Sequence, residues 1–510
     1  MNIIDAVYEA FSPQKAARRM AARVALNKLR EYEGASRGTR RTDKWVTRGT
    51  SSNAELRKAL PILRDRARDL VRNNPYATRA VNVIAGAIVG YGIKTTLRTT
   101  NKRNQKPLQD AFTAWFESTD CDIEGNHDGY GLQDVAARAL AESGEVLLRR
   151  VWVRRKNPRD IPIALQVLEA DYIDTRQDSV TVGGNRVIQG KEYDANGRCV
   201  AYYLFDDHPG DAFSLAQTRY TSKRVSADDI THLFRMDRPG QGRGVTWFAP
   251  VILRLRDLDE YEDAQLIRQK IAACFTVFIG NADGGAEQTN LNKDAEDLID
   301  RLEPGLIQPL PTGMSATLAS PPGVQGYQEY MSVSVHAVAA GLSVPYEALT
   351  GDYSGVNFTS GKIGFGQFYT IADTWQWKTF IPKFCGNTVR WFKEAAMLAG
   401  YNTDGVTAKY TPPHRPMLDP TREVPAIIKA VRGGLMTQPE AIRAQGQDPD
   451  EFLEESKEWN AKADAAGIVL DSDPRKITNG GQAQANSPPD DDDPNGDGSG
   501  TKNNNSNGDV

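Results

Sequence analysis

The sequence predicts an α+β fold divided into more than one domain. The chain has 510 residues, which is too long for one simple core. Its first half mixes helical apolar spacing with short β-branched and aromatic runs that end at turn residues. Its second half is dominated by helical patterns, the longest of which begins near Pro250. These three observations favour a mixed domain followed by helical elements.

The first 245 residues contain most of the expected strands. Ser12-Pro13 begins a basic helix that extends to about Arg30, because proline suits the first helical position. Leucines at near-helical spacing predict a second basic helix over 54–73. The turn residues Asn185, 194–197 and 209–210 separate the strands. The remaining expected elements are helices over 107–117 and 132–142 and strands over 146–153, 163–168 and 200–205.

A long helix is predicted after Pro250, because its apolar residues recur every three or four positions and form one stripe. Roughly 25–30 residues would reach about 40 Å. Glycines over 280–285 are expected to end the helix. A small module over 281–324 and a returning helix over 325–342 complete a stalk with a tip. The stripe consists of Leu255, Leu258, Tyr261, Ala264, Ile267, Ile271 and Cys274.

The stripe has no evident partner within the chain, so we expect copies of the chain to cover it. Subunits arranged head-to-tail bury such a surface, and they form a ring when the rotation closes. Small residues on the returning helix suit close packing in such a ring. The residues expected to pack between subunits are Leu255, Leu258, Tyr261, Ile267, Ile271, Val333, Ala337 and Ala340.

The segment over 341–366 is expected to be a helix end followed by a polar, flexible loop. Gly341 is a natural helix stop, and Val344 is biased away from helix because proline follows it. Five glycines lie between Gly351 and Gly366. An aromatic segment and a helical set over 423–459 follow, and Thr437 and Asp448 provide capping oxygens three residues before Glu. Beyond 471 the composition predicts disorder.

Charge is distributed unevenly along the chain. Residues 1–80 carry 18 Lys/Arg against 8 Asp/Glu, whereas residues 440–510 carry 6 against 16. Such asymmetry suggests different partners at the two ends, although solvated termini would show the same pattern. The four cysteines lie far apart, which fits a reducing compartment, and no apolar run is long enough for a membrane span.

Four motifs in the chain resemble the lambda family of tailed-phage portal proteins. They are the stretch from Gly341 to Asn357, the run from Arg238 to Ala264, the segment from Pro412 to Val424, and Gly446 to Glu451. The resemblance implies a portal-protein fold: an N-terminal arm and α/β wing (1–248), a two-helix stem (249–280 and 325–342) and a small α/β clip (281–324). It also implies a tunnel loop with a long wing helix (343–410) and a helical crown (411–470). An acidic tail (471–510) follows.

The function that the resemblance implies is mechanical rather than catalytic. Portal proteins of this family form a ring of about twelve copies at one capsid vertex of the virion, after assembly in the bacterial cytoplasm. Double-stranded DNA passes through the ring without sequence specificity. The expected partners are the terminase large subunit, a head-completion or connector protein, and the major capsid or scaffold protein; no membrane is involved. The tunnel-loop residues expected to approach DNA are Asn357, Thr359, Ser360 and Lys362.

Two other classes of function remain as alternatives. A sequence-independent DNA-binding protein would use basic residues of the N-terminal arm, namely Arg18, Arg19, Arg23, Arg40 and Arg41. A hydrolase would rely on Ser36, which lies in a G-x-S-x-G match without the strand and helix that the motif requires. Residues 355–362 fail as a phosphate-binding loop, and the five histidines show no zinc-binding spacing. We therefore expect no catalytic residue, cofactor or metal site.

Overall fold

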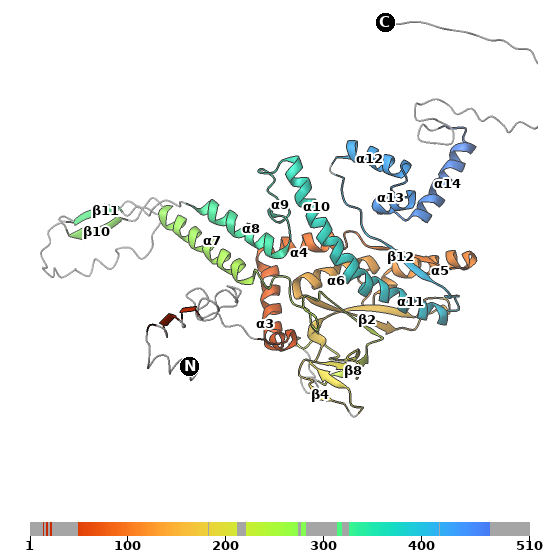
Figure 1. Ribbon diagram of the computed structural model, residues 1–510, viewed down its shortest axis with the longest axis horizontal. Helices are drawn as coiled ribbons and strands as arrows, with labels where there is room; N and C mark the ends of the chain where they lie inside the picture. The colour runs from red at the N-terminus through yellow and green to blue at the C-terminus, as the bar shows by residue number, and fades with distance from the viewer. Residues whose placement is uncertain are drawn as a thin grey trace, which may run out of the picture. The chain divides into compact units, whose positions relative to one another are not determined.

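The computed structural model describes residues 49–181, 183–211, 221–273, 277–281, 314–318, 326–417 and 419–469, and five positions between residues 14 and 22 (Figure 1). The chain divides into two compact units. One comprises Met1–Ala59 with Arg238–Gly242, and the other comprises Leu60–Asp237 with Arg243–Val510. Helix α3 (Ser52–Asn73) confirms the second basic helix. The first predicted helix lies almost wholly outside the described residues.

In the smaller unit, the start of α3 holds the loop over 238–242. The Asn53 side chain donates to the Gly240 carbonyl at 3.0 Å and accepts from the Gly242 amide at 2.8 Å. Arg238 forms an ion pair with Glu55 at 2.8 Å. Three side-chain contacts therefore fix a loop that is distant from α3 in the sequence.

The larger unit is built around a three-stranded antiparallel sheet in the order β3-β2-β9. Its central strand β2 (Glu145–Trp152) pairs with β3 (Ile163–Glu169) and β9 (Ile230–Phe234). Helices α4 (Pro75–Ile88) and α6 (Gly129–Ser143) contribute buried faces to the same core. Gly144 ends α6 at φ 84°, and a Cβ there would lie 2.1 Å from the Val245 carbonyl carbon. The core therefore requires a glycine between α6 and β2.

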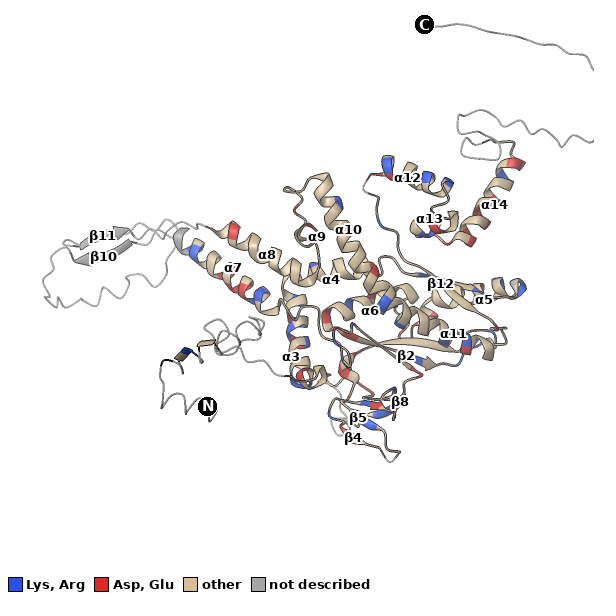
Figure 2. Cartoon of the chain, viewed as in Figure 1, with Lys and Arg blue, Asp and Glu red and all other residues tan. Residues whose placement is uncertain are grey.

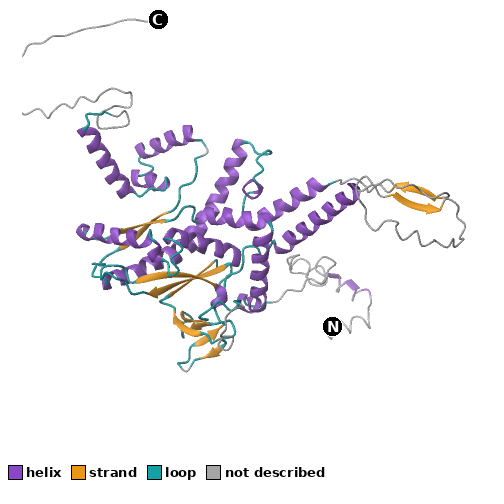
Figure 3. Cartoon of the chain, turned by 180° about the vertical axis from the view of Figure 1, so that it is seen from behind, coloured by secondary structure: helices purple, strands orange, loops and turns teal. Residues whose placement is uncertain are grey.

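A five-stranded antiparallel meander forms the second sheet of this unit (Figure 3). The predicted turns at Asn185 and over 194–197 are confirmed, since they join successive strands. The predicted strands over 146–153, 163–168 and 200–205 are also confirmed. The meander consists of β4 (Ser179–Val180), β5 (Arg186–Ile188), β6 (Lys191–Tyr193), β7 (Cys199–Leu204) and β8 (Lys223–Ser226).

Helix α5 (Lys102–Phe116) begins earlier than predicted. The Asn101 side chain caps it by accepting from the Arg103 amide at 3.1 Å, so Pro107 lies inside the helix rather than at its start. Pro107 therefore does not mark the start of this helix.

Two strands that are far apart in the sequence form a separate two-stranded antiparallel sheet, in which β1 (Lys94–Arg98) pairs with β12 (Thr407–Thr411).

The two helices expected to form the stem correspond to α7 (Ile252–Ala273) and α8 (Tyr327–Leu342), which lie side by side in Figures 1 and 3. The long helix is shorter than predicted: it ends at Ala273, and β10 (Val277–Asn281) follows. Strand β10 pairs with β11 (Met314–Leu318). Most of the predicted clip lies outside the described residues. None of the described helices is long and apolar enough to cross a membrane.

Helix α8 ends at Leu342 as predicted, but Gly341 does not stop it. The left-handed residue at its end is Ser343, with φ 57°. Gly341 lies within the helix, and a Cβ there would lie 2.4 Å from Cγ1 of Val251. The glycine therefore permits close packing of α8 against the residue that precedes α7.

The prediction of a flexible loop over 351–366 is largely wrong, because helix α10 begins at Phe358. After α9 (Tyr346–Thr350), irregular chain extends only to Asn357, and α10 (Phe358–Trp375) includes the three later glycines. A π-helical stretch (Gln376–Cys385) and α11 (Gly386–Leu398) continue the same helical run. Aromatic side chains at buried positions, among them Phe368, Trp375 and Phe380, attach this run to the core and outweigh the low helix propensity of glycine.

Three helices form the C-terminal described region. They are α12 (Pro420–Arg432), α13 (Gln438–Ala444) and α14 (Pro449–Ala465). Both predicted caps are confirmed: Thr437 accepts from the Glu440 amide at 3.3 Å, and Asp448 accepts from the Glu451 amide at 3.2 Å. The predicted tail lies outside the described residues.

Candidate interaction surfaces of the stem and tunnel loop

The base of the stem is anchored to the wing sheet by a buried ion pair. The Arg243 guanidinium donates to Glu145 at the start of β2, with Nη2 2.6 Å from Oε1. The Gly244 amide donates to the same carboxylate at 2.8 Å. Phe248, four residues after Gly244, is fully buried. Its carbonyl oxygen accepts from the Val251 amide at 2.8 Å, and α7 begins at the next residue. The direction of the stem helix is thus set by contacts inside the wing.

The first half of the α7 stripe packs inside its own chain. Leu255 and Leu258 have exposed fractions of 0% and 1% and belong to the main hydrophobic core. Tyr261 stacks on Tyr327 and contacts Tyr330 of α8, with ring centroids 5.9 and 4.4 Å apart. The prediction that Leu255 and Leu258 pack against a second copy is therefore wrong. The sequence could not show that the chain's own core covers them, because that core is assembled from residues far apart in the sequence.

The outer part of the stem presents apolar side chains to solvent. Ile267 on α7 is 56% exposed and Val333 on α8 is 67% exposed. Ala340 is also exposed, whereas Ala337 is half-buried. The Ile271 side chain lies outside the described residues. Three further exposed apolar residues of these two helices were not selected in the sequence analysis, namely Leu253 in the first turn of α7, Leu266 and Tyr330.

Two of the predicted tunnel-loop residues cap a helix. Asn357 Oδ1 accepts from the Ser360 amide at 2.8 Å, and Ser360 Oγ accepts from the Asn357 amide at 3.2 Å. This reciprocal pair satisfies amides that would otherwise lack partners at the start of α10. Thr359 is exposed in the first turn. The structure thus places these residues together at one helix end.

Lys362, the predicted cation of this region, forms an ion pair with the C-terminal helices. Its Nζ lies 2.7 Å from Oε1 of Glu423 on α12 and 6.0 Å from the centre of the Phe358 ring. The Lys362 side chain remains 49% exposed. Glu423 was expected only as the first residue of a helix, and no local pattern links it to a residue 61 positions earlier.

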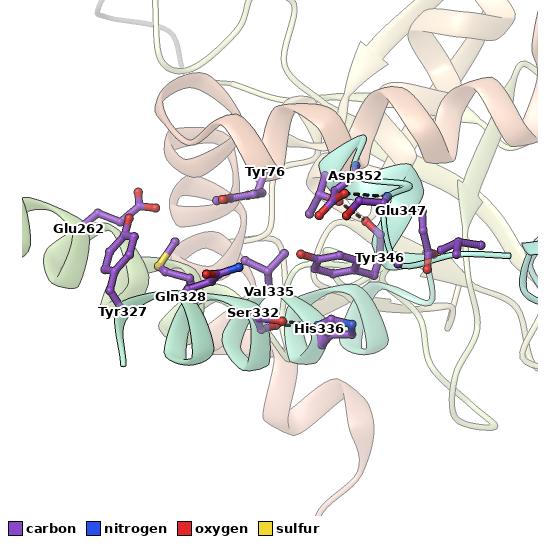
Figure 4. Close-up of a pocket in the computed structure, with 15 residues that line it drawn as sticks. Tyr76, Glu262, Tyr327, Gln328, Ser332, Val335, His336, Tyr346, Glu347 and Asp352 are labelled. Atoms are coloured by element: carbon purple, nitrogen blue, oxygen red, sulfur yellow. Dashed lines mark hydrogen bonds between the residues drawn. The ribbon is translucent and has the colours of Figure 1, made fainter. Parts of the chain in front are cut away.

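A pocket of about 540 Å³ lies between α8, α9 and the chain that leads to α10 (Figure 4). Figure 4 shows Tyr76 and Tyr346 facing the same space. The described residues of its lining include the carboxylates of Glu262, Glu347 and Asp352 and no Lys or Arg. Burial, and then the nearby carboxylates of Asp259 and Asp263, raise the pKa of Glu262. Such a lining repels phosphate, so DNA is not expected to enter this pocket.

One group of described side chains has metal-ligand chemistry. Ligand atoms of Glu169, Asp171 and His208 lie within 4.8 Å of one another. However, Nη2 of Arg68 lies 2.8 Å from the Glu169 carboxylate and 2.7 Å from that of Asp171. A cation would have to displace this guanidinium, so the group is better described as an ion-pair cluster.

The residues of the two alternative functions lie mostly where the structure gives no description. Ser36, Arg19, Arg23, Arg40 and Arg41 fall outside the described residues. Arg18 belongs to a short helical segment and is exposed.

The class of the protein follows from this fold together with a family match. The family model described as phage portal protein, lambda family, matches residues 38–376. The chain belongs to this family. The α+β portal fold and the portal class expected from the motifs are therefore confirmed, and with them the role of a component of the phage head-to-tail connector.

Individual relatives resemble the chain over most of its length. It is 26% identical to the probable portal protein of Halomonas phage phiHAP-1 over 83% of this chain and 85% of that protein. It is 22% identical to the portal protein of Escherichia phage N15 over 86% of this chain and 92% of that protein. A chain in the neck of the native gene transfer agent particle, computed with C12 symmetry, is 15% identical with a TM-score of 0.45. That match covers 75% of this chain and 94% of the other.

Proposed function

We propose that copies of this chain form a closed ring at one capsid vertex, through which double-stranded DNA is packaged and later ejected. The observation that supports the ring is the exposed apolar surface of the stem, defined here as Leu253, Leu266, Ile267, Tyr330 and Val333. Exposed apolar side chains gathered on two neighbouring helices are typical of an interaction site in a protein exposed to water. Because the chain belongs to the portal family, we expect another copy of the chain to cover this surface.

The geometry of the stem surface favours a head-to-tail contact. Ile267 and Val333 belong to different helices, so two unlike surfaces are available for neighbouring copies. Unlike surfaces that meet head-to-tail form a ring when the rotation closes, and about twelve copies are expected. Leu255 and Leu258 take no part in this contact, because each chain already buries them.

The tunnel-loop region is suited to letting DNA slide. Each neutralised phosphate adds affinity by releasing a counterion, so a channel must offer few free cations. Lys362 is paired with Glu423 at 2.7 Å, and the pocket lining beside this region is acidic. The ring is proposed to contact DNA weakly and without sequence preference, and to catalyse no reaction itself.

The further partners follow from the family and not from the described contacts. The clip is proposed to dock the terminase large subunit during packaging and the head-completion protein afterwards. The wing and the N-terminal arm are proposed to meet the major capsid or scaffold protein during assembly in the host cytoplasm.

Native mass spectrometry and negative-stain imaging of the purified full-length chain test the ring. We expect a closed ring of about a dozen subunits. Val333→Asp should abolish it, whereas Leu398→Asp should not, because Leu398 is equally exposed (68% against 67%) but lies on α11. A wild-type chain that stays monomeric or dimeric under several salt conditions would contradict the proposal and favour the DNA-binding alternative.

A further inference from the structure

The three C-terminal helices α12, α13 and α14 have almost no buried side chains. Among them only Asp448, the cap of α14, and Pro449 are buried, whereas α12 and α13 have no buried residue. Helices of this length are marginal in water unless one face is covered. Helices α12 and α14 each pack on α13 through half-buried residues, which leaves a second face of each uncovered.

The uncovered face of α12 is apolar and basic. Val424 and Ile428 are 41% and 47% exposed, and Arg432 continues the same line at four-residue spacing. Lys429 lies beside them. Within the described part of the chain, neither Lys429 nor Arg432 has an ion-pair partner. This face, Val424-Ile428-Arg432, is called the basic stripe.

Between Phe452 and Trp459 the uncovered face of α14 is aromatic and acidic, and the exposed Lys462 follows one turn beyond Trp459. Phe452 and Trp459 lie two helical turns apart and are 37% and 60% exposed, with Glu455 between them. Three other acids of α14 already pair with Arg98, Lys94 and Lys106 of the wing. Glu455 and Glu458, by contrast, show no ion pair among the described residues. This face, Phe452-Glu455-Trp459, is called the acidic stripe. Figure 2 shows that α14 carries both acidic and basic residues.

We infer that the basic stripe of one copy packs against the acidic stripe of the next copy. Pairing of like stripes is disfavoured, because two basic stripes or two acidic stripes would bring equal charges together. The match of unlike stripes defines a head-to-tail contact, which is the type that generates a ring. This inference rests on the proposed ring and adds a second, electrostatic contact that is separate from the apolar stem surface.

Cysteine cross-linking between different chains tests the contact directly. Ile428→Cys chains carrying one tag are co-expressed with Trp459→Cys chains carrying another, and the complex is oxidised mildly. We expect a disulfide-linked dimer that carries both tags. Ile428→Cys with Leu453→Cys is the matched control, because Leu453 is 68% exposed but lies on another side of α14. Leu453 is six residues before Trp459, which is less than the seven residues of two full helical turns. The wild-type chain, with its four native cysteines, gives the background.

Charge reversal tests the chemistry of the contact. Arg432→Glu and Glu455→Arg are each expected to raise the concentration at which half of the rings dissociate, by about fivefold. The double variant is expected to restore the wild-type value. The inference is overturned if the disulfide-linked dimer with both tags forms as readily with Leu453→Cys as with Trp459→Cys. It is also overturned if the single charge reversals leave the dissociation of the rings unchanged.

The outcomes separate this inference from the proposed function. Rings in the wild type without the Ile428–Trp459 cross-link overturn the contact and leave the ring intact. A specific cross-link in short, open assemblies supports the contact and overturns the closed ring. Monomeric wild-type protein with no cross-link overturns both.

Discussion

The Arg243 guanidinium holds both oxygens of the Glu145 carboxylate, with Nη2 2.6 Å from Oε1 and Nε 3.0 Å from Oε2. Both side chains are almost fully buried. Burial alone would raise the pKa of Glu145, but Arg243 and His232 hold it well below its usual range. Because Arg243 precedes the stem helix and Glu145 begins β2, this pair joins the stem to the wing.

Glu145→Ala should destabilise the protein strongly. The change removes the carboxylate that pairs with the buried Arg243 charge, and such losses cost about 3–5 kcal/mol. Thermal and chemical unfolding of the full-length chain measure the effect. Glu169→Ala is the control, because its carboxylate also pairs with an arginine but is 50% exposed; its cost should stay below about 1 kcal/mol. Equal effects of the two changes would show that the buried pair contributes no more than a surface pair.

Acid should weaken the wing through His232. Burial, and then Lys191, lower the pKa of His232 to about 3, while Glu145 at 2.9 Å acts in the opposite direction. Between about pH 6.5 and 3 the unfolded state therefore binds a proton that the folded state excludes, so stability falls as pH falls, by up to about 1.4 kcal/mol per pH unit. Glu145, whose pKa is lowered, adds to the loss only below about pH 4.5.

His232→Gln isolates this contribution. The variant should show a smaller slope of unfolding free energy against pH between 6.5 and 5, and exposed His127→Gln serves as the control. A wild-type slope in the His232 variant would assign the acid sensitivity to other groups.

Local patterns predicted local structure well and long-range contacts poorly. The caps at Thr437 and Asp448 require residues only three positions apart, so the sequence displays them completely. The partner of Lys362 lies 61 positions away, and no periodicity indicates it. Leu255 likewise resembles an uncovered stripe residue, because the core that buries it is assembled from distant segments. The role of Gly341 could not be predicted for the same reason, because the glycine is required by the close approach of Val251, a residue 90 positions earlier in the sequence.

Gly341→Ala should destabilise the stem although alanine favours helix. The added methyl would lie 2.4 Å from Cγ1 of Val251, which is 2% exposed and has little room to move. Overpacking of this kind costs about 1–3 kcal/mol, against about 1 kcal/mol gained from helix propensity. Hydrogen exchange of α8 and thermal unfolding measure the net loss. Adding Val251→Ala should recover part of it, and a stabilised single variant would contradict the close packing.

Lys362 and Glu423 should behave as a pair in DNA packaging. If Lys362 acts mainly by holding α10 to α12 through its 2.7 Å contact, Lys362→Ala and Glu423→Ala should change packaging similarly, and the double variant should add little. The direct effect on stability should be below about 1 kcal/mol, because the lysine side chain is 49% exposed. Packaged DNA per particle and the salt dependence of packaging are the measurements. If Lys362→Ala alone lowers packaging and its salt dependence while Glu423→Ala does not, the lysine contacts phosphate and the ion pair is secondary.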